Sequence, residues 1–149
     1  MKNRFIEALK EFHEKFGHPT GTGTNDPTEF LKRLELRMKL IEEEANEFYT
    51  AAAACAVSAQ YGLKENQRVS MVEMIDGIAD LLVVVVGTAV TFGIPLATAF
   101  ERVHLSNMSK LGADGQPIYR EDGKILKGPG FFPPALAGLV TDDLEFVQE

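Results

Sequence analysis

Glu42-Glu43-Glu44-Ala45-Asn46-Glu47 is the stretch that decides the fold, and it lies in an uninterrupted helical pattern from Leu34 to Cys55. At about 100° per residue, Glu44 falls in the middle of an apolar stripe, with Glu43 and Glu47 at its edge. The stripe consists of Leu40, Ile41, Phe48, Ala51 and Cys55. Like charges one turn apart repel, and a carboxylate on an apolar face is costly unless a cation compensates it. The pattern therefore favours an acidic ligand site over a solvated helix face.

A second acidic cluster lies on another predicted helix, from about Val69 to Phe92. Glu73, Asp76 and Asp80 share one arc of about 60°, and the residues around Asp80 are strongly apolar. Carboxylates that enter a core from two helices need a cation, and oxygen ligands at this density suit Mg²⁺ or Mn²⁺. Together the two clusters predict one metal site.

The composition is that of one soluble globular domain, residues 1–149, with 45% hydrophobic and 25% charged residues. A formal net charge of −7 argues against nucleic acid as a partner, because binding a phosphate backbone needs a basic surface. Residues 1–10 lack the apolar core of a secretory signal. The most apolar run, Leu81–Ile94, is shorter than the roughly 20 residues of a membrane span and is expected to be a buried helix. The single cysteine, Cys55, fits a reducing compartment, so we expect a cytoplasmic protein without a membrane partner.

The spacing of apolar residues predicts an all-α helical bundle of four main helices, over about residues 3–16, 27–61, 69–92 and 96–111. In the first helix, Phe12 and Phe16 are expected in the core. Asn25 or Asp26 is expected to cap the second, which would be on the order of 50 Å long. The third is apolar on nearly every side, which is more surface than one small bundle covers. We therefore expect a homodimer or a homotetramer.

From Gly112 onward, turn residues dominate and an irregular C-terminal segment is expected. Within it, Asp122-Gly123 lies between Ile118-Tyr119-Arg120 and Lys124-Ile125-Leu126, which is a signal for a short β-hairpin.

Glu43-Glu44-Ala45-Asn46-Glu47-Phe48 resembles the EExxE signature of the MazG-like, all-α nucleotide pyrophosphohydrolases, which include phosphoribosyl-ATP pyrophosphohydrolase. Ile78-Ala79-Asp80-Leu81-Leu82 resembles the family's second signature, ExxD followed by apolar residues. Residues 103–110 and 122–127 are similar to the segment that follows in the subgroup of dimeric dUTPases. The similarity covers about residues 30–134. One position departs from it, because Gly77 replaces the Glu expected three residues before Asp80, and Asp76 or Glu73 would have to supply that ligand.

The resemblance implies Mg²⁺-dependent hydrolysis of a nucleoside triphosphate to the monophosphate and pyrophosphate, with Mn²⁺ as the other suitable cation. It makes dUTP or another deoxy or non-standard nucleotide a candidate substrate. Glu43 would orient or deprotonate the attacking water. Arg37, on the stripe of Glu44, would neutralise carboxylates or reach a substrate phosphate. The implied metal ligands are Glu44, Glu47, Asp76 and Asp80, and the implied contacts to phosphate or sugar oxygens are Asn107, Lys110 and Lys124.

Two other classes of protein stay open at this point. A di-iron carboxylate bundle needs two Glu-x-x-His motifs, and Glu101-Arg102-Val103-His104 is the only one in the chain. A non-catalytic helical interaction module would leave Asp80 on an apolar helix without a reason. Binding of Mg²⁺, of iron or of no metal would separate the three classes.

Overall fold

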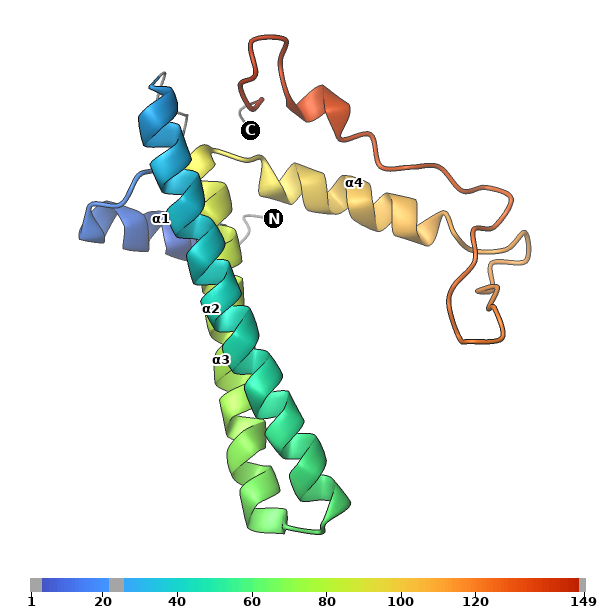
Figure 1. Ribbon diagram of the computed structural model, residues 1–149. Helices are drawn as coiled ribbons and strands as arrows, with labels where there is room; N and C mark the ends of the chain where they lie inside the picture. The colour runs from blue at the N-terminus through green and yellow to red at the C-terminus, as the bar shows by residue number, and fades with distance from the viewer. Residues whose placement is uncertain (1–3, 22–25, 148–149) are drawn as a thin grey trace. The chain divides into compact units, whose positions relative to one another are not determined.

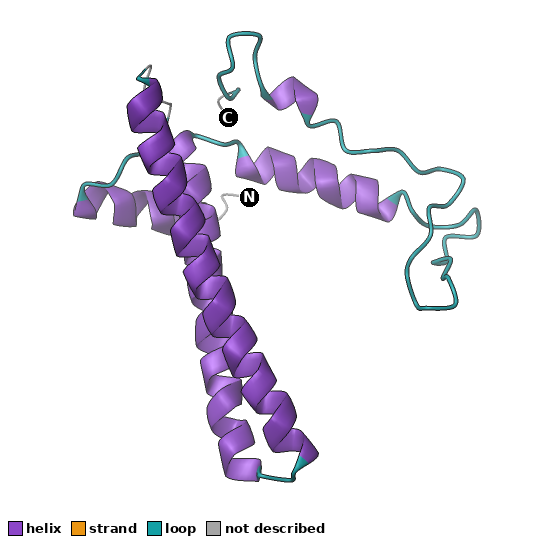
Figure 2. Ribbon diagram, viewed as in Figure 1, coloured by secondary structure: helices purple, strands orange, loops and turns teal. Residues whose placement is uncertain are grey.

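The computed structural model describes residues 4–21 and 26–147, and over these residues the protein is all-α, as predicted. Four helices follow one another along the chain and are succeeded by one turn of 3-10 helix, η1 (Figures 1 and 2). Their bounds are Arg4–Phe16 for α1, Pro27–Gln60 for α2, Lys64–Phe92 for α3, Leu96–Met108 for α4 and Ala137–Leu139 for η1. The chain divides into two compact units: unit 1 ends at Gly93, and unit 2 begins at Ile94.

α2 and α3 form a long antiparallel hairpin in unit 1 (Figure 1). Asp26 caps α2 as expected, since its carboxylate accepts a hydrogen bond from the backbone N–H of Thr28 at 2.9 Å. Asn25, the other predicted cap, lies outside the described residues. Gly62 turns the chain with φ 66°, and α3 begins at Lys64 rather than near Val69. The residues from Lys64 onward that were left outside the predicted helix therefore form the first turn of α3, because Gly62 already supplies the reversal.

Gly77 brings the backbones of the two long helices into close approach. A Cβ atom at this position would lie 3.1 Å from the Cα atom of Phe48. The contact is therefore with the backbone of α2. The missing side chain therefore sets the spacing between the two acidic helices at this level.

α1 packs on α3 through Leu9 and His13, not through the phenylalanines that were expected in the core. Phe12 and Phe16 are 42% and 68% exposed, and their rings stack on each other with centroids 4.5 Å apart. His13 is only 1% exposed because the chain turns back after α1, so that the carbonyl of Pro19 lies 2.8 Å from Nδ1 of the imidazole. The expectation for Phe12 and Phe16 was wrong because His13 takes the buried position on α1. Its hydrogen-bonding partner, Pro19, lies in the loop after the helix, which the pattern of apolar residues does not show.

The buried imidazole predicts a dependence of stability on pH. Burial lowers the pKa of His13, and nearby Arg37 and His18 lower it further against the opposing hydrogen bond to Pro19. The folded state thus binds fewer protons than the unfolded state, whose histidine pKa is about 6.5. The free energy of unfolding should therefore be highest above about pH 6.5. It should fall as the pH drops from there toward the lower pKa of His13 in the folded state. Urea unfolding of wild type and His13→Gln at several pH values measures this, and an equal pH dependence in both proteins would contradict it.

α3 is buried on fewer sides in the single chain than its sequence indicated. Most residues from Val84 to Phe92 are buried, whereas Val72, Ile75 and Ile78 are 62%, 69% and 54% exposed. Asp80 is exposed as well, so it does not enter the core of the isolated chain. No single described helix is both long and apolar enough to cross a membrane, and only α3 and α4 counted together reach that length and composition.

In unit 2, the segment after α4 is held to the helix by polar side chains. The hydroxyl of Ser106 donates to the carbonyl of Phe132 at 2.8 Å, and the N–H of Phe132 donates to the hydroxyl of Ser109 at 3.1 Å. Arg102 donates through Nη1 to the carbonyl of Ala135 at 2.6 Å. The backbone of Gly128 approaches the turn that follows α4 so closely that a Cβ atom would meet the carbonyl oxygen of Leu111 at 2.0 Å.

The β-hairpin predicted around Asp122-Gly123 is not formed as paired strands. Tyr119 and Ile125 form one isolated antiparallel bridge, and the described residues beside it are turns or irregular backbone. The carboxylate of Asp122 accepts hydrogen bonds from Arg120 and from the N–H of Lys124. Backbone bonds from Arg120 N–H to the carbonyl of Lys124 at 2.8 Å and from Leu126 N–H to the carbonyl of Ile118 at 2.7 Å also close the turn, but the pairing does not extend into strands.

Candidate active site

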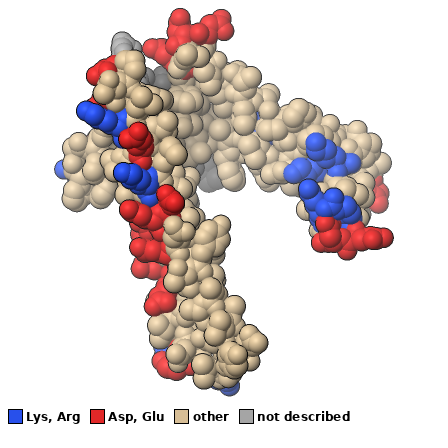
Figure 3. All heavy atoms as spheres, viewed as in Figure 1, with Lys and Arg blue, Asp and Glu red and all other residues tan. Residues whose placement is uncertain are grey.

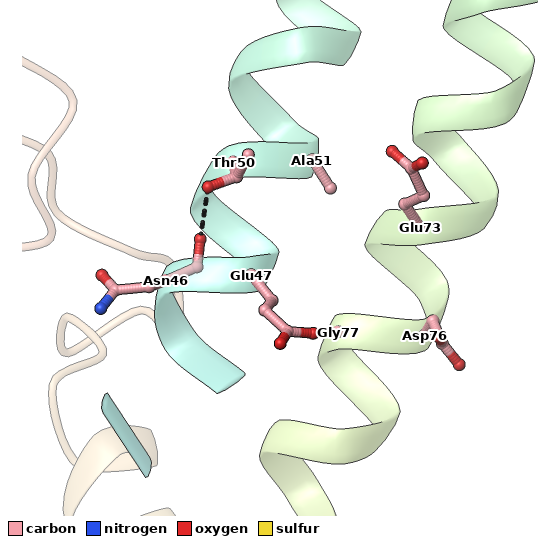
Figure 4. A pocket seen from close by; sticks show the side chains of 7 residues that line it. All are labelled: Asn46, Glu47, Thr50, Ala51, Glu73, Asp76 and Gly77. Atoms are coloured by element: carbon pink, nitrogen blue, oxygen red, sulfur yellow. Dashed lines mark hydrogen bonds between the residues drawn. The ribbon is translucent and has the colours of Figure 1, made fainter. Parts of the chain in front are cut away.

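An open groove of about 450 Å³ between α2 and α3 brings residues of both acidic clusters together. Its lining consists of Asn46, Glu47, Thr50, Ala51, Glu73, Asp76 and Gly77 (Figure 4). The carboxylate of Glu47 extends from α2 toward α3 beside Gly77 (Figure 4). Because Gly77 has no side chain, the backbone of α2 at Phe48, the residue after Glu47, lies close to α3 at this level.

The other polar groups of the groove differ in direction. The carboxylate of Glu73 points along the groove to the level of Ala51, whereas that of Asp76 points away from α2 (Figure 4). Thr50 uses its hydroxyl within α2, donating to the carbonyl of Asn46 at 2.8 Å. The groove therefore presents carboxylates and few free neutral donors.

The pKa of Glu44 is raised by its surroundings, which include acidic residues of both long helices. Burial raises the pKa of its carboxyl, and the negative charges of four other carboxylates from both helices raise it further. In decreasing order of effect, these are Glu47, Asp80, Glu43 and Asp76. None of the ion pairs between described residues involves a member of this cluster. On the face shown in Figure 3, acidic side chains gather along the middle of α2.

Residues 9–107 match the family described as phosphoribosyl-ATP pyrophosphohydrolase, and this stretch contains both acidic helices. The chain belongs to that family. A comparison with curated proteins found no match. As a family member the protein is a nucleotide pyrophosphohydrolase, which decides against the di-iron bundle and the non-catalytic module.

Members of this pyrophosphohydrolase family typically depend on a divalent cation, and the donor set of the groove fits one. The groove and its surroundings offer carboxylate oxygens, which Mg²⁺ and Mn²⁺ prefer, and the repulsion on Glu44 is the kind that a cation relieves. With the side chains as they lie, no three His, Cys, Asp or Glu residues of the described chain converge on one point. The groove therefore fits a divalent cation in the type of its ligands and in the placement of the two helices that carry them.

Glu73 was not among the metal ligands predicted from the sequence resemblance, although it was named as a substitute for the missing Glu at Gly77. It lines the groove with Glu47 and Asp76, whereas Asp80 lies outside the lining and acts on Glu44. Glu73-Met74-Ile75-Asp76 itself has the spacing of the ExxD signature. This signal was available in the sequence, and aligning the signature on Asp80 concealed it.

Arg37 contacts α3 and not the acidic cluster. Its Nε donates to the hydroxyl of Thr88 at 3.0 Å and its Nη2 to the carbonyl of Val84 at 2.7 Å. A Cβ atom at Gly87 would lie 2.6 Å from Nη2, so the guanidinium lies directly on the backbone of α3. Arg37 was expected to bind carboxylates or a substrate phosphate, but its Nε and Nη2 atoms instead join α2 to α3.

The other predicted contacts to phosphate or sugar oxygens, Asn107, Lys110 and Lys124, belong to unit 2. Lys110 donates through Nζ to the side-chain oxygen of Asn107 at 2.7 Å, which places these two residues side by side at the end of α4. Lys124 lies in the turn that begins at Asp122. Lys127 places its ammonium group 4.3 Å from the ring centre of Phe131. Figure 3 shows the resulting concentration of basic side chains in the part of unit 2 that follows α4.

Proposed function

We propose that this pyrophosphohydrolase cleaves a nucleoside triphosphate, with dUTP and other deoxy or non-standard nucleotides as the first candidates. Water would add to a phosphorus of the anhydride, and the P–O bond would break to release pyrophosphate and the nucleoside monophosphate. The observation that carries the proposal is the groove that Glu47, Glu73 and Asp76 line, in a chain of this family.

The carboxylates of α2 and α3 are the proposed ligands of Mg²⁺ or Mn²⁺. The position of Glu47, Glu73 and Asp76 in the lining of the groove supports these three as ligands, and the charge that Asp80 exerts on Glu44 from the facing helix supports Asp80 and Glu44. When bound, such a cation neutralises phosphate charge and lowers the pKa of a bound water. Glu43, exposed beside Glu44, is the proposed base that accepts the proton of the attacking water. Asn107, Lys110 and Lys124 are proposed to bind phosphate or sugar oxygens.

The test is pyrophosphate release from a panel of ribo- and deoxynucleoside triphosphates and phosphoribosyl-ATP, each with Mg²⁺ and with Mn²⁺. We expect turnover of at least one nucleoside triphosphate above that of phosphoribosyl-ATP. Reaction in ¹⁸O-labelled water, followed by mass spectrometry of both products, identifies the phosphorus that is attacked. Exclusive turnover of phosphoribosyl-ATP would contradict the proposed substrate while leaving the family activity intact.

Removal of divalent metal is expected to abolish turnover and to lower thermal stability. A cation that binds only the folded protein adds about 2.7 kcal/mol at a hundred times its dissociation constant. Without the cation, Glu44 and Glu47 repel each other and the carboxylates of α3. Calorimetry and pyrophosphate assays with EDTA, followed by addition of excess Mg²⁺, measure both effects. Unchanged melting temperature and turnover after chelation would exclude the metal site.

The exposed apolar side of α3 supports a homodimer or a homotetramer. Val72, Ile75 and Ile78 form an apolar patch that a single chain leaves to solvent, and a second copy could cover it. We expect sedimentation at micromolar concentration to give at least a dimer, and Ile75→Glu to dissociate it by placing a charge in the interface. A wild-type monomer under these conditions would contradict this proposal.

A further inference from the structure

The acidic groove has a neighbour farther along the same helix hairpin. A second cleft of about 300 Å³ lies between α2 and α3, and Glu73 lines both. Other residues lining it include Ala54, Ser58, Asn66, Val69 and Ser70. From Asp76 to Asn66 the helix rises by about 15 Å, so the two clefts form a row along α3 in the direction of the Gly62 turn.

The second cleft differs from the first in its chemistry. Glu65 and Glu73 are its acidic members, and the rest of the lining is small, apolar or neutral polar. A valine surface with an amide and hydroxyls around it suits a flat ring with a polar edge, and it offers no cation for phosphate. Such a lining fits the uncharged part of a nucleotide.

Ser58 is the residue in this cleft whose hydroxyl is unused. Ser58 is only 6% exposed, and no hydrogen bond joins its hydroxyl to another described residue. Fully enclosed side-chain polar atoms without a partner are absent among the described residues, so the hydroxyl oxygen reaches the open cleft. Ser70, equally buried at 5%, instead donates to the carbonyl of Asn66 at 3.1 Å. The hydroxyl of Ser58 is thus held in a buried residue, has no partner within the described protein and is open to the cleft, where a ligand can replace water as its hydrogen-bonding partner.

We propose that this second cleft binds the nucleoside part of the substrate, with Ser58 as a specificity-determining hydrogen-bonding residue and Asn66 as its companion across the cleft. The inference rests on the proposed function, because the carboxylates of the first groove then hold the phosphates through the cation. The nucleoside extends from there past Glu73, the residue common to both clefts.

Ser58→Ala tests the assignment, with Ser70→Ala as the matched control in the same cleft. For Ser58→Ala we expect the ratio of kcat/KM between the best and the next nucleoside triphosphate to fall about fivefold, the effect of one hydrogen bond. Ser70→Ala should change this ratio less than twofold, because its hydroxyl is already engaged within α3. Inhibition by free pyrophosphate should be the same in wild type and both variants, since pyrophosphate has no nucleoside part.

An unchanged substrate ratio in Ser58→Ala would overturn the inference, and so would an altered inhibition by pyrophosphate. A wild type that turns over no nucleoside triphosphate would refute the proposed function instead. In that case, calorimetric titration with nucleoside monophosphates tests whether the second cleft binds a nucleoside. Binding that Ser58→Ala weakens and Ser70→Ala preserves would support the cleft, and absence of such binding would overturn it.

Discussion

Asp76→Asn is expected to lower the rate of pyrophosphate release by about 100-fold or more, while the free energy of unfolding of the metal-free protein stays the same or rises. Loss of a residue that only orients a metal ligand costs about 10- to 100-fold, so loss of a ligand itself should cost at least the upper value. The substitution also removes one of the negative charges that act on Glu44, which relieves repulsion in the folded state. Steady-state assays and urea unfolding of the same preparation measure the two effects.

Glu73→Gln and Glu42→Gln complete this experiment. Glu73 lines the groove and should show a loss comparable to that of Asp76→Asn, whereas exposed Glu42 belongs to the same acidic run and lies outside the groove. Near-normal activity in Asp76→Asn together with a loss in Glu73→Gln would transfer the ligand role to Glu73. This outcome would agree with the direction of the Asp76 carboxylate, which points away from α2 (Figure 4).

Gly77→Glu is expected to destabilise the protein by about 3 kcal/mol or more and to abolish activity, although it places the acidic residue of the family signature three residues before Asp80. Even a Cβ atom at this position would lie 3.1 Å from the Cα atom of Phe48 and 3.2 Å from its backbone nitrogen. A longer side chain must displace α2 or bury its carboxylate against it, and both overpacking and an unpaired charge are costly. Thermal and urea unfolding measure the loss of stability.

Ala79→Glu is the matched control for Gly77→Glu, because residue 79 lies on the same helix and is exposed. It adds the same charge to α3 without approaching α2 and should change stability by less than about 0.5 kcal/mol. If Gly77→Glu instead folds normally and is more active than wild type, the glycine is a defect in the signature and the assignment of Glu73 and Asp76 is wrong.

The helices could be predicted because their signals are local. Asp26 caps α2, Gly62 and Gly93 end the long helices, and the apolar spacing between these points is helical. The core position of His13 could not be predicted in this way. It depends on the carbonyl of Pro19 and on the approach of α3, which hydropathy along α1 does not contain.

The acidic chemistry of the candidate site could be predicted from the sequence, whereas the residues that line it could be predicted only in part. Both acidic clusters were evident, and the structure brings Glu47 and Asp76 to one groove. The choice between Glu73 and Asp80 depends on the level at which α3 lies beside α2, and the contact of Gly77 with Phe48 sets that level. The partners of Arg37 on α3 depend on the same alignment of the two helices.

The attachment of the C-terminal segment to α4 has a consequence for how this protein can change during evolution. Ser106, Ser109 and Arg102 contact the backbone of Phe132 and Ala135, and every amino acid other than proline offers the same backbone groups. The information for this attachment is therefore encoded in the helix, and the segment itself is free to drift. Gly128 is the exception, because no side chain fits against Leu111, and it should stay fixed while its neighbours diverge.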